Sequence, residues 1–262
     1  MNFASVRYSH EAGISRITLN RPEKLNSLTR SMMRELATAL NLTQEDQARV
    51  LLIQGTGRGF CAGQDLSEHD FSQGTENIAF EQLIREVYEP VILQIQALNI
   101  PVVAAVNGMA AGTGASLALA CDIVIATRSA YFLQAFAKIG LIPDAGGTWF
   151  LQRLVGNARA MGLAMLGERL SASDAQDWGL IWKCVDDEKF TAEVEALVRH
   201  LSTAPTLAMA HTKHSIYAAS ANTLAEQIAL EAKYQGELGK TADLLEGVTA
   251  FLQKRAPSFS GK

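Results

Sequence analysis

Apolar and polar positions along the chain predict a series of short strands. Residues 3–8 and 13–19 alternate in polarity on either side of the turn residues His10-Glu11-Ala12-Gly13, which is typical of a β-hairpin. Short, mostly apolar runs favour buried strands. Such runs occur at 50–55, 101–108, 121–132 and 182–185.

Helical spacing separates these strands. Apolar residues recur every fourth position from Leu28 to Leu40, so we expect a helix over 28–41 with Ser27 as its N-cap. The segment 55–66 contains four glycines and is expected to be a loop. Further helices are predicted at 77–98, where Pro90 should cause a kink or break, at 112–120, and over most of the chain from about 147 onward.

The alternation of short strands with helices predicts an α/β fold. The last part of the chain differs, because 200–256 shows helical spacing with no strand between the helices. We therefore expect a core domain over 1–200 and a helical region over 201–262, and helices of this kind often pack across a partner subunit.

Composition excludes several classes of protein. The chain has 262 residues, 48% of them hydrophobic, and a net charge of −4, which suits one large globular domain and opposes a nucleic-acid partner. Cys61, Cys121 and Cys184 lie far apart, which favours neither a zinc site nor disulfides. The opening residues 1–13 lack a signal-peptide core, and no apolar run approaches membrane length. These features predict a cytoplasmic protein without a membrane partner.

Two glycine-rich segments each follow an apolar strand: 57–66 and 107–122. Neither fits the GxGxxG spacing of a dinucleotide loop. Because glycine has no side chain to obstruct the backbone, both segments can present N–H groups to a ligand. Two such groups that converge on one point form an oxyanion hole, although glycines also serve tight packing alone.

One carboxylate, Asp144, stands in the mostly apolar segment GLIPDAGGTWF (140–150). An ionised group is costly in such surroundings unless something compensates. Two roles are open at this point: Asp144 caps a helix that begins at 146–148, or it transfers protons.

Several longer segments resemble the enoyl-CoA hydratase/isomerase (crotonase) superfamily, and the closing EGVTAFLQKRAPSFSGK resembles its bacterial 1,2-epoxyphenylacetyl-CoA isomerases in particular. The resemblance implies a crotonase fold of repeated ββα units with a C-terminal helical region, assembled as a homotrimer or as a hexamer of two trimers. The segments that carry it are NRPEKLNSL (20–28), GRGFCAGQDL (57–66), PVVAAVNGMAAGTGASLALACDIVIA (101–126), GLIPDAGGTWFLQRLVG (140–156) and AQDWGLIWKCVDD (175–187).

The same resemblance implies an acyl-CoA thioester as substrate, with coenzyme A (CoA) as part of it and no metal or redox cofactor. The backbone N–H groups of Gln64 and Thr113 would hold the thioester oxygen, and Asp144 would be the acid/base. Phe136, Leu141 and Trp149 would line the acyl pocket. The positions implied for CoA are Arg21, Lys24, Leu25, Ala62, Asp65 and Leu66.

Three positions depart from the family pattern. Many relatives carry glycine where this chain has Thr113, so we expect the threonine side chain to point away from the hole. The two glutamates of a hydratase fall on Ser116 and Phe136, neither of which can take a proton from water. We therefore expect an isomerase that converts ring-1,2-epoxyphenylacetyl-CoA to oxepin-CoA, or alternatively a Δ3,Δ2-enoyl-CoA isomerase.

Two further alternatives stay open. A dehalogenase-like hydrolysis would use Asp144 as nucleophile, but it needs an activating histidine that the sequence does not locate. A non-catalytic, RNA-binding member of the superfamily is opposed by the net charge of −4.

Overall fold

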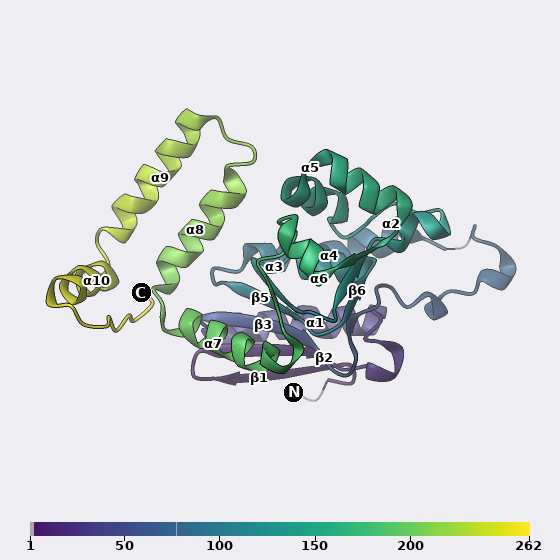
Figure 1. Ribbon diagram of the computed structural model, residues 1–262, viewed down its shortest axis with the longest axis horizontal. Coiled ribbons are helices and arrows are strands. Elements are labelled where there is room, and N and C mark those ends of the chain that lie inside the picture. Colours follow the sequence, from purple (N-terminus) through teal and green to yellow (C-terminus); the bar gives the residue numbers. More distant parts are fainter. Residues whose placement is uncertain (1–2, 77) are drawn as a thin grey trace.

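Two β-sheets form the centre of the structure, a computed structural model that describes residues 3–76 and 78–262 (Figure 1). The larger sheet has six strands in the order β1-β2-β3-β5-β7-β10, namely Val6–Glu11, Ile14–Leu19, Val50–Gly55, Val102–Val106, Ile123–Thr127 and Lys183–Val185. The smaller sheet has four strands in the order β4-β6-β8-β9, namely Gly59–Cys61, Met109–Ala111, Tyr131–Leu133 and Arg169–Ser171.

The chain passes from the larger to the smaller sheet three times, in the pairs β3–β4, β5–β6 and β7–β8. Strands β3, β5 and β7 are parallel neighbours, and so are β4, β6 and β8. A helical segment follows each pair before the next strand begins. The predicted α/β fold of repeated ββα units is therefore confirmed, together with the hairpin, which joins β1 and β2.

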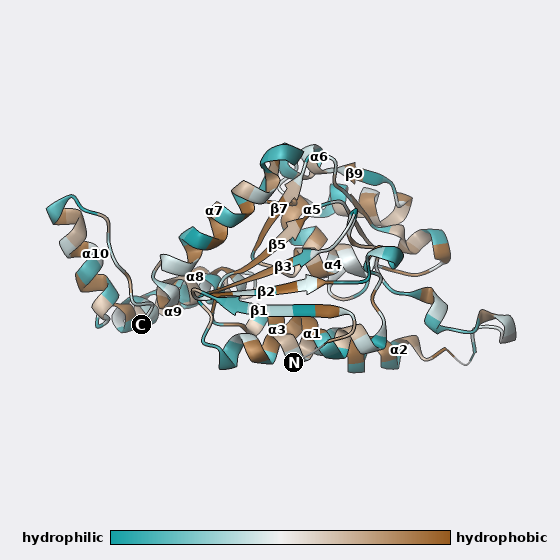
Figure 2. Cartoon of the chain, turned by 90° about the horizontal axis from the view of Figure 1, so that it is seen from below, coloured by the Kyte–Doolittle hydropathy of each residue, from teal (hydrophilic) through white to brown (hydrophobic). Residues whose placement is uncertain are grey.

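Helices cover both faces of the larger sheet (Figure 2). Helices α1 (Arg30–Glu45) and α3 (Glu89–Ala97) lie on one face, and α7 (Phe190–Thr203) lies on the other. Strand β3 contributes to both layers, because successive side chains of a strand point to opposite faces. Leu51 and Ile53 join the apolar cluster that includes α1, whereas Val50 and Leu52 pack with the buried residues of α7.

Helix α1 begins two residues later than predicted, at Arg30, and its N-cap is Thr29 rather than Ser27. The Thr29 hydroxyl accepts a hydrogen bond from the Met32 amide at 3.1 Å. Leu28 cannot be helical, because it forms a parallel bridge with Gln64. Contact with the distant loop that holds Gln64 therefore determines where α1 begins.

The predicted helix over 77–98 is interrupted, and residue 77 lies outside the described residues. A short helix α2 (Phe80–Leu83) is followed by a widened turn of π-helix over Ile84–Tyr88 and then by α3. Pro90 lies in the first turn of α3 and has no N–H to donate to the π-helical turn before it. The regular α-helix is therefore broken just before Pro90, and a kink at Pro90 itself stays a prediction.

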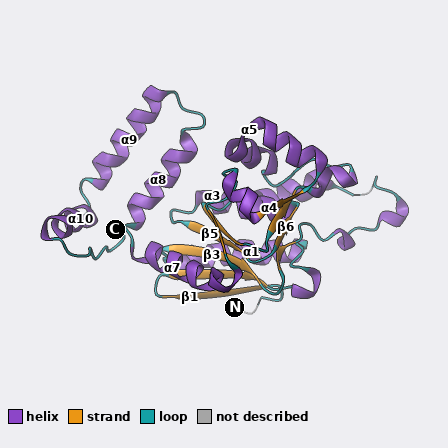
Figure 3. Ribbon diagram, viewed as in Figure 1, coloured by secondary structure: helices purple, strands orange, loops and turns teal. Residues whose placement is uncertain are grey.

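The remaining helices in the described part of the chain are α4 (Thr113–Leu119), α5 (Gly147–Leu166), α6 (Ala172–Asp177), α8 (Thr206–Ala218), α9 (Leu224–Leu238) and α10 (Ala242–Gln253). The last three follow one another without a strand and extend away from the sheets (Figures 1 and 3).

The expected boundary between the core domain and the helical region, at 200–201, falls inside α7, which packs on the larger sheet. The chain turns away from α7 at 204–205. No helix in the described ranges is long and apolar enough to cross a membrane.

The expected loop over 55–66 is wrong at β4, because residues 59–61 pair with β6. Strands β6 and β9 also have only three residues. These three strands lie beside glycines or polar residues and not in a longer apolar run, so the sequence pattern did not predict them.

Gly114 at the start of α4 is essential for close packing against β4. A β-carbon built at this position would lie 2.5 Å from the Cys61 carbonyl oxygen and 2.6 Å from its sulfur. We expect Gly114→Ala to destabilise the protein by about 1–3 kcal/mol, since the core must shift to admit the methyl group. Urea-induced unfolding measures this change.

Gly162→Ala is the matched control, because nothing lies within 4 Å of its added carbon and the residue is inside α5. We expect it to stabilise the protein by up to about 1 kcal/mol through helix propensity. Equal unfolding free energies for the two variants would contradict this account of the α4–β4 contact.

Candidate active site

The two glycine-rich loops meet because the strands before them are paired. Strands β4 and β6 run parallel, so the segments that leave them, 62–64 and 112–113, emerge on the same side. A β-carbon built on Gly63 would lie 2.7 Å from the Ala111 carbonyl oxygen and 3.4 Å from the Thr113 nitrogen. Gly63 also has a φ of +91°, so both its conformation and the available space require glycine.

The backbone N–H groups of Gln64 and Thr113 donate no hydrogen bond within the described part of the chain. Their neighbours are engaged: the amide of Asp65 donates to Leu28 and that of Gly112 to Leu133, at 2.9 and 2.8 Å. Thr113 is the first residue of α4, where an amide has no partner inside the helix. Two free donors on adjacent loops are the arrangement that an oxyanion hole needs.

Asp144 lies in the turn between the 3-10 helix Ala135–Ile139, which follows β8, and α5. Its Oδ1 accepts a hydrogen bond from the Thr113 hydroxyl at 2.8 Å. The N-cap of α5 is Gly146, with no side-chain capping bond, so the capping role for Asp144 is wrong. The Thr113 side chain is directed at this carboxylate.

Burial raises the pKa of Asp144 to about 6. The Thr113 hydrogen bond, and one from the backbone of Asp144 itself, lower the pKa and so oppose part of this effect. Asp144 is therefore ionised at neutral pH but is a stronger base than an exposed aspartate. A group with these properties is suited to accept a proton.

Phe136 and Leu141 form an apolar wall beside the loop 112–113. Phe136 is 6% exposed, and its ring approaches a β-carbon built on Gly112 at 3.7 Å. The Leu141 amide donates to the Phe136 carbonyl oxygen at 3.0 Å, which holds the two residues together. Apolar neighbours of this kind exclude water from a buried carboxylate.

Trp149 lies in the first turn of α5, and its contact with an acyl group stays a prediction. Its indole lines a groove of about 780 Å³ between α5 and α8, together with Lys213 and Tyr217. The Arg153 guanidinium lies 3.9 Å from the ring centroid. Trp149 therefore lies on the face of α5 that is turned toward α8. Tertiary packing determines this face, and the distance in sequence between Trp149 and Asp144 does not.

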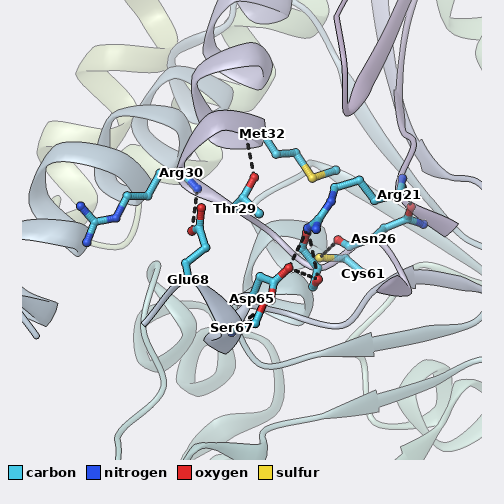
Figure 4. A network of polar contacts seen from close by, with 10 residues as sticks. Arg21, Asn26, Thr29, Arg30, Met32, Cys61, Asp65, Ser67 and Glu68 are labelled. Carbon is cyan, nitrogen blue, oxygen red and sulfur yellow. Dashed lines mark hydrogen bonds and ion pairs between the residues drawn. The ribbon is translucent and has the colours of Figure 1, made fainter. Parts of the chain in front are cut away.

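Arg21 and Asp65, both predicted for CoA, pair with each other in the structure (Figure 4). The Arg21 guanidinium lies 2.9 Å from Asp65 Oδ2 and also donates to the Ser27 carbonyl oxygen at 2.6 Å. Hydrogen bonds from the Ser67 hydroxyl and then Arg21 hold the pKa of Asp65 at about 2. This ion pair connects the segment 20–28 to the segment that follows Gln64.

The other CoA candidates lie around this connection. Lys24 is exposed and takes part in no ion pair within the described ranges, and Leu66 is 38% exposed, so both are accessible to a ligand. Leu25 has a φ of +50°, and its carbonyl oxygen accepts from the Ala62 amide at 2.9 Å. Contact of these residues with CoA stays a prediction.

One further contact at the site could not be predicted from the sequence pattern. The Gln64 side chain lies 2.7 Å from a ring nitrogen of His69, whose ring packs near Phe71 and Phe80. His69 is five positions after Gln64 in a segment of irregular spacing. This histidine makes no hydrogen bond with Asp144 in the described structure.

Comparison with known proteins now decides the family. The family model described as enoyl-CoA hydratase/isomerase matches residues 9–262. The chain belongs to this family. A crotonase structure, the enoyl-CoA hydratase from a Polaromonas species, superimposes with a TM-score of 0.90 at 35% identity over 97% of this chain and 99% of that one.

Two crotonase relatives are similar to this chain at nearly equal identity. The 1,2-epoxyphenylacetyl-CoA isomerase of Escherichia coli is 49% identical over 96% of this chain and 97% of its own length. A Rhodobacter capsulatus protein named "Probable enoyl-CoA hydratase" is 48% identical over the whole of both chains. The overall similarity therefore shows that the chain is a crotonase enzyme. The residues of the site are needed to distinguish an isomerase from a hydratase.

The raised pKa of Asp144 predicts a pH-dependent cost to stability. Because the pKa is raised from 3.8 to about 6, the native state favours the neutral carboxyl; this stabilisation is full below pH 4 and is lost as the pH rises through 6. We expect Asp144→Asn, which is neutral at every pH, to be about 2–3 kcal/mol more stable than wild type at pH 8.

Chemical unfolding at pH 4 and pH 8 measures this difference. The advantage of Asp144→Asn should shrink toward zero at pH 4, where both side chains are neutral. A constant difference at the two pH values would contradict the assignment of a buried, ionised Asp144.

Proposed function

We propose that this crotonase is an acyl-CoA isomerase in which Asp144 moves a proton from C2 of the acyl group. The observation that supports this most is the combination of one half-buried carboxylate with two free amides on adjacent loops. A carbonyl oxygen bound to the amides of Gln64 and Thr113 would bring the carbon next to the thioester toward Asp144.

The first step removes the C2 proton. The electron pair of the C2–H bond moves into the thioester, which becomes an enolate, and the proton goes to Asp144. Two N–H donors stabilise the negative oxygen, and loss of one such donor typically costs about 2.7–4 kcal/mol of transition-state stabilisation. The burial that makes Asp144 more basic favours the same step.

The second step returns the same proton further along the acyl chain. In a 3-enoyl-CoA, protonation at C4 gives the conjugated 2-enoyl product and reforms the thioester carbonyl. In ring-1,2-epoxyphenylacetyl-CoA, the corresponding shift would accompany opening of the ring to the seven-membered oxepin. One carboxylate serves both steps, so no metal or redox cofactor is required.

Two side chains argue against hydration of a double bond. Where hydratases of this family use glutamates, the chain has Ser116, which is fully buried, and Phe136, whose ring covers Gly112. No neighbouring charge contributes to the pKa of Asp144, as a second catalytic carboxylate would. A water molecule at this site would have one carboxylate base, and positions 116 and 136 would supply no second carboxylate.

The acyl group is proposed to be the ring epoxide of phenylacetyl-CoA, as in the E. coli relative's name. Isomerisation of a 3-enoyl-CoA uses the same groups and is the alternative substrate assignment. A nucleophilic Asp144 needs an activating histidine, and His69 contacts Gln64 instead. An acidic chain with a buried base also does not favour an RNA-binding role.

We also propose that copies of this chain assemble through the C-terminal helices, as a trimer or a pair of trimers. Helices α9 and α10 expose large apolar side chains, among them Leu224, Phe251 and Leu252 at 77, 82 and 74%. Such a surface is unusual on a monomer and is typical of a contact between proteins.

Asp144→Asn tests the reaction. The amide cannot accept the C2 proton, so we expect turnover to fall by at least about 1,000-fold for both candidate substrates, with little change in Kd for acyl-CoA. Nuclear magnetic resonance in deuterated buffer should show exchange of the C2 hydrogen by wild type and none by the variant.

Wild-type exchange and turnover with the ring epoxide, but not with straight-chain 3-enoyl-CoA, would assign the substrate. Turnover by Asp144→Asn near the wild-type rate would exclude the proposed mechanism, and efficient addition of water to 2-enoyl-CoA by wild type would favour a hydratase.

A pair of charge substitutions tests the assembly. We expect the wild-type chain of 28.3 kDa to elute at a multiple of that mass, and Phe251→Asp with Leu252→Asp to elute as a monomer, because buried charges oppose association. Leu93→Asp on α3, at a position 58% exposed, is the control and should keep the assembly. Light scattering after gel filtration gives the masses, and a monomeric wild type would refute the assembly.

A further inference from the structure

We propose that Thr113 is a positioning residue for Asp144: its hydroxyl holds Oδ1, so that Oδ2 is the oxygen that accepts the C2 proton, while its amide holds the thioester oxygen. This role rests on the proposed isomerase function and makes it more specific. One residue would thereby set the distance between the base and the oxyanion hole.

The geometry supports a rigid link. Thr113 is 2% exposed and begins α4, and its hydroxyl donates to Asp144 Oδ1 at 2.8 Å. A β-branched side chain has few rotamers, so its hydroxyl has a well-defined direction. The Thr113 amide remains free and lies beside Gly63. The hydroxyl of Thr113 therefore contacts Asp144, and its amide is free to bind the thioester oxygen.

Asp144 needs such a partner. The terminal torsion of an aspartate is broad, so a carboxylate without a fixed hydrogen bond samples several orientations. Asp144 does not use its side chain to cap α5, and Thr113 is the one side chain that hydrogen-bonds it within the described structure. A glycine at this position would have no hydroxyl and could not supply this contact.

The hydroxyl also affects proton affinity. A donor to an ionised carboxylate favours the charged form, so Thr113 lowers the pKa of Asp144 against the effect of burial. The nearby titratable groups are Tyr88, from the π-helical turn, and Cys61, against Gly114 on α4. Burial raises the pKa of both, to about 12 for Cys61, so neither changes charge between pH 4 and pH 9.

Thr113→Val tests the proposal, because valine keeps the shape and the amide but removes the hydroxyl. We expect kcat to fall about tenfold or more, KM to stay within about twofold, and the acidic limb of the kcat profile to move up by about one pH unit. Thr113→Ser, which keeps the hydroxyl, should restore the wild-type profile and most of kcat.

Thr43→Val is the matched control. The Thr43 hydroxyl is also buried and donates at 2.9 Å, but to the Ala39 carbonyl oxygen inside α1. Its removal should leave kcat and the pH profile at wild-type values. If replacing any buried threonine by valine lowered kcat, Thr43→Val would lower it too.

A carbon-13 titration of Asp144 in the substrate-free protein separates this proposal from the proposed function. The pKa of Asp144 should be higher in Thr113→Val than in wild type, whatever reaction the enzyme catalyses. An unchanged pKa together with an unchanged kcat would overturn the positioning role. Failure of wild type to exchange C2 hydrogen would instead overturn the isomerase. If Thr113→Val does not fold, Thr113→Ala provides the same contrast.

Discussion

The parallel pairing of β4 with β6 is the constraint on which the candidate site depends. Only two residue pairs make this contact, yet they bring two loops side by side that are about 50 positions apart in the sequence. Because the chain leaves both strands on the same side, the free amides of Gln64 and Thr113 become neighbours. The glycines at 63 and 114 permit this approach, since a side chain at either would meet the facing backbone.

The third strand of the smaller sheet completes the arrangement. Strand β8 pairs with β6 and leads through Phe136 to Asp144, so the base arrives next to the loop that holds Thr113. The fold thus supplies three parallel strands in one sheet, and the segments after them supply two donors and one carboxylate. Burial then raises the pKa of this carboxylate to about 6, so it is ionised at neutral pH and is a stronger base than an exposed aspartate.

The sequence predicted the parts of this structure that local patterns control. Polarity gave the hairpin and the strands β3 and β5, and Asp144 stood out because a charge among apolar residues needs an explanation. Strand β4 lies in a glycine-rich segment without such a pattern, and the N-cap of α1 depends on the bridge between Leu28 and Gln64. The groove that Trp149 lines could not be predicted for a related reason, since the face of α5 that meets α8 is set by packing. The contact of Thr113 with Asp144 joins residues 31 positions apart and could not be derived from spacing.

The proposed reaction requires a thioester carbonyl between the amides of Gln64 and Thr113, beside Asp144. Infrared difference spectroscopy of a carbon-13-labelled acyl-CoA bound to Asp144→Asn, which holds the substrate without turnover, tests this directly. Two strong donors polarise the C=O bond, so its stretching frequency should be lower in the complex than in water. A frequency equal to that of the free thioester would contradict the account.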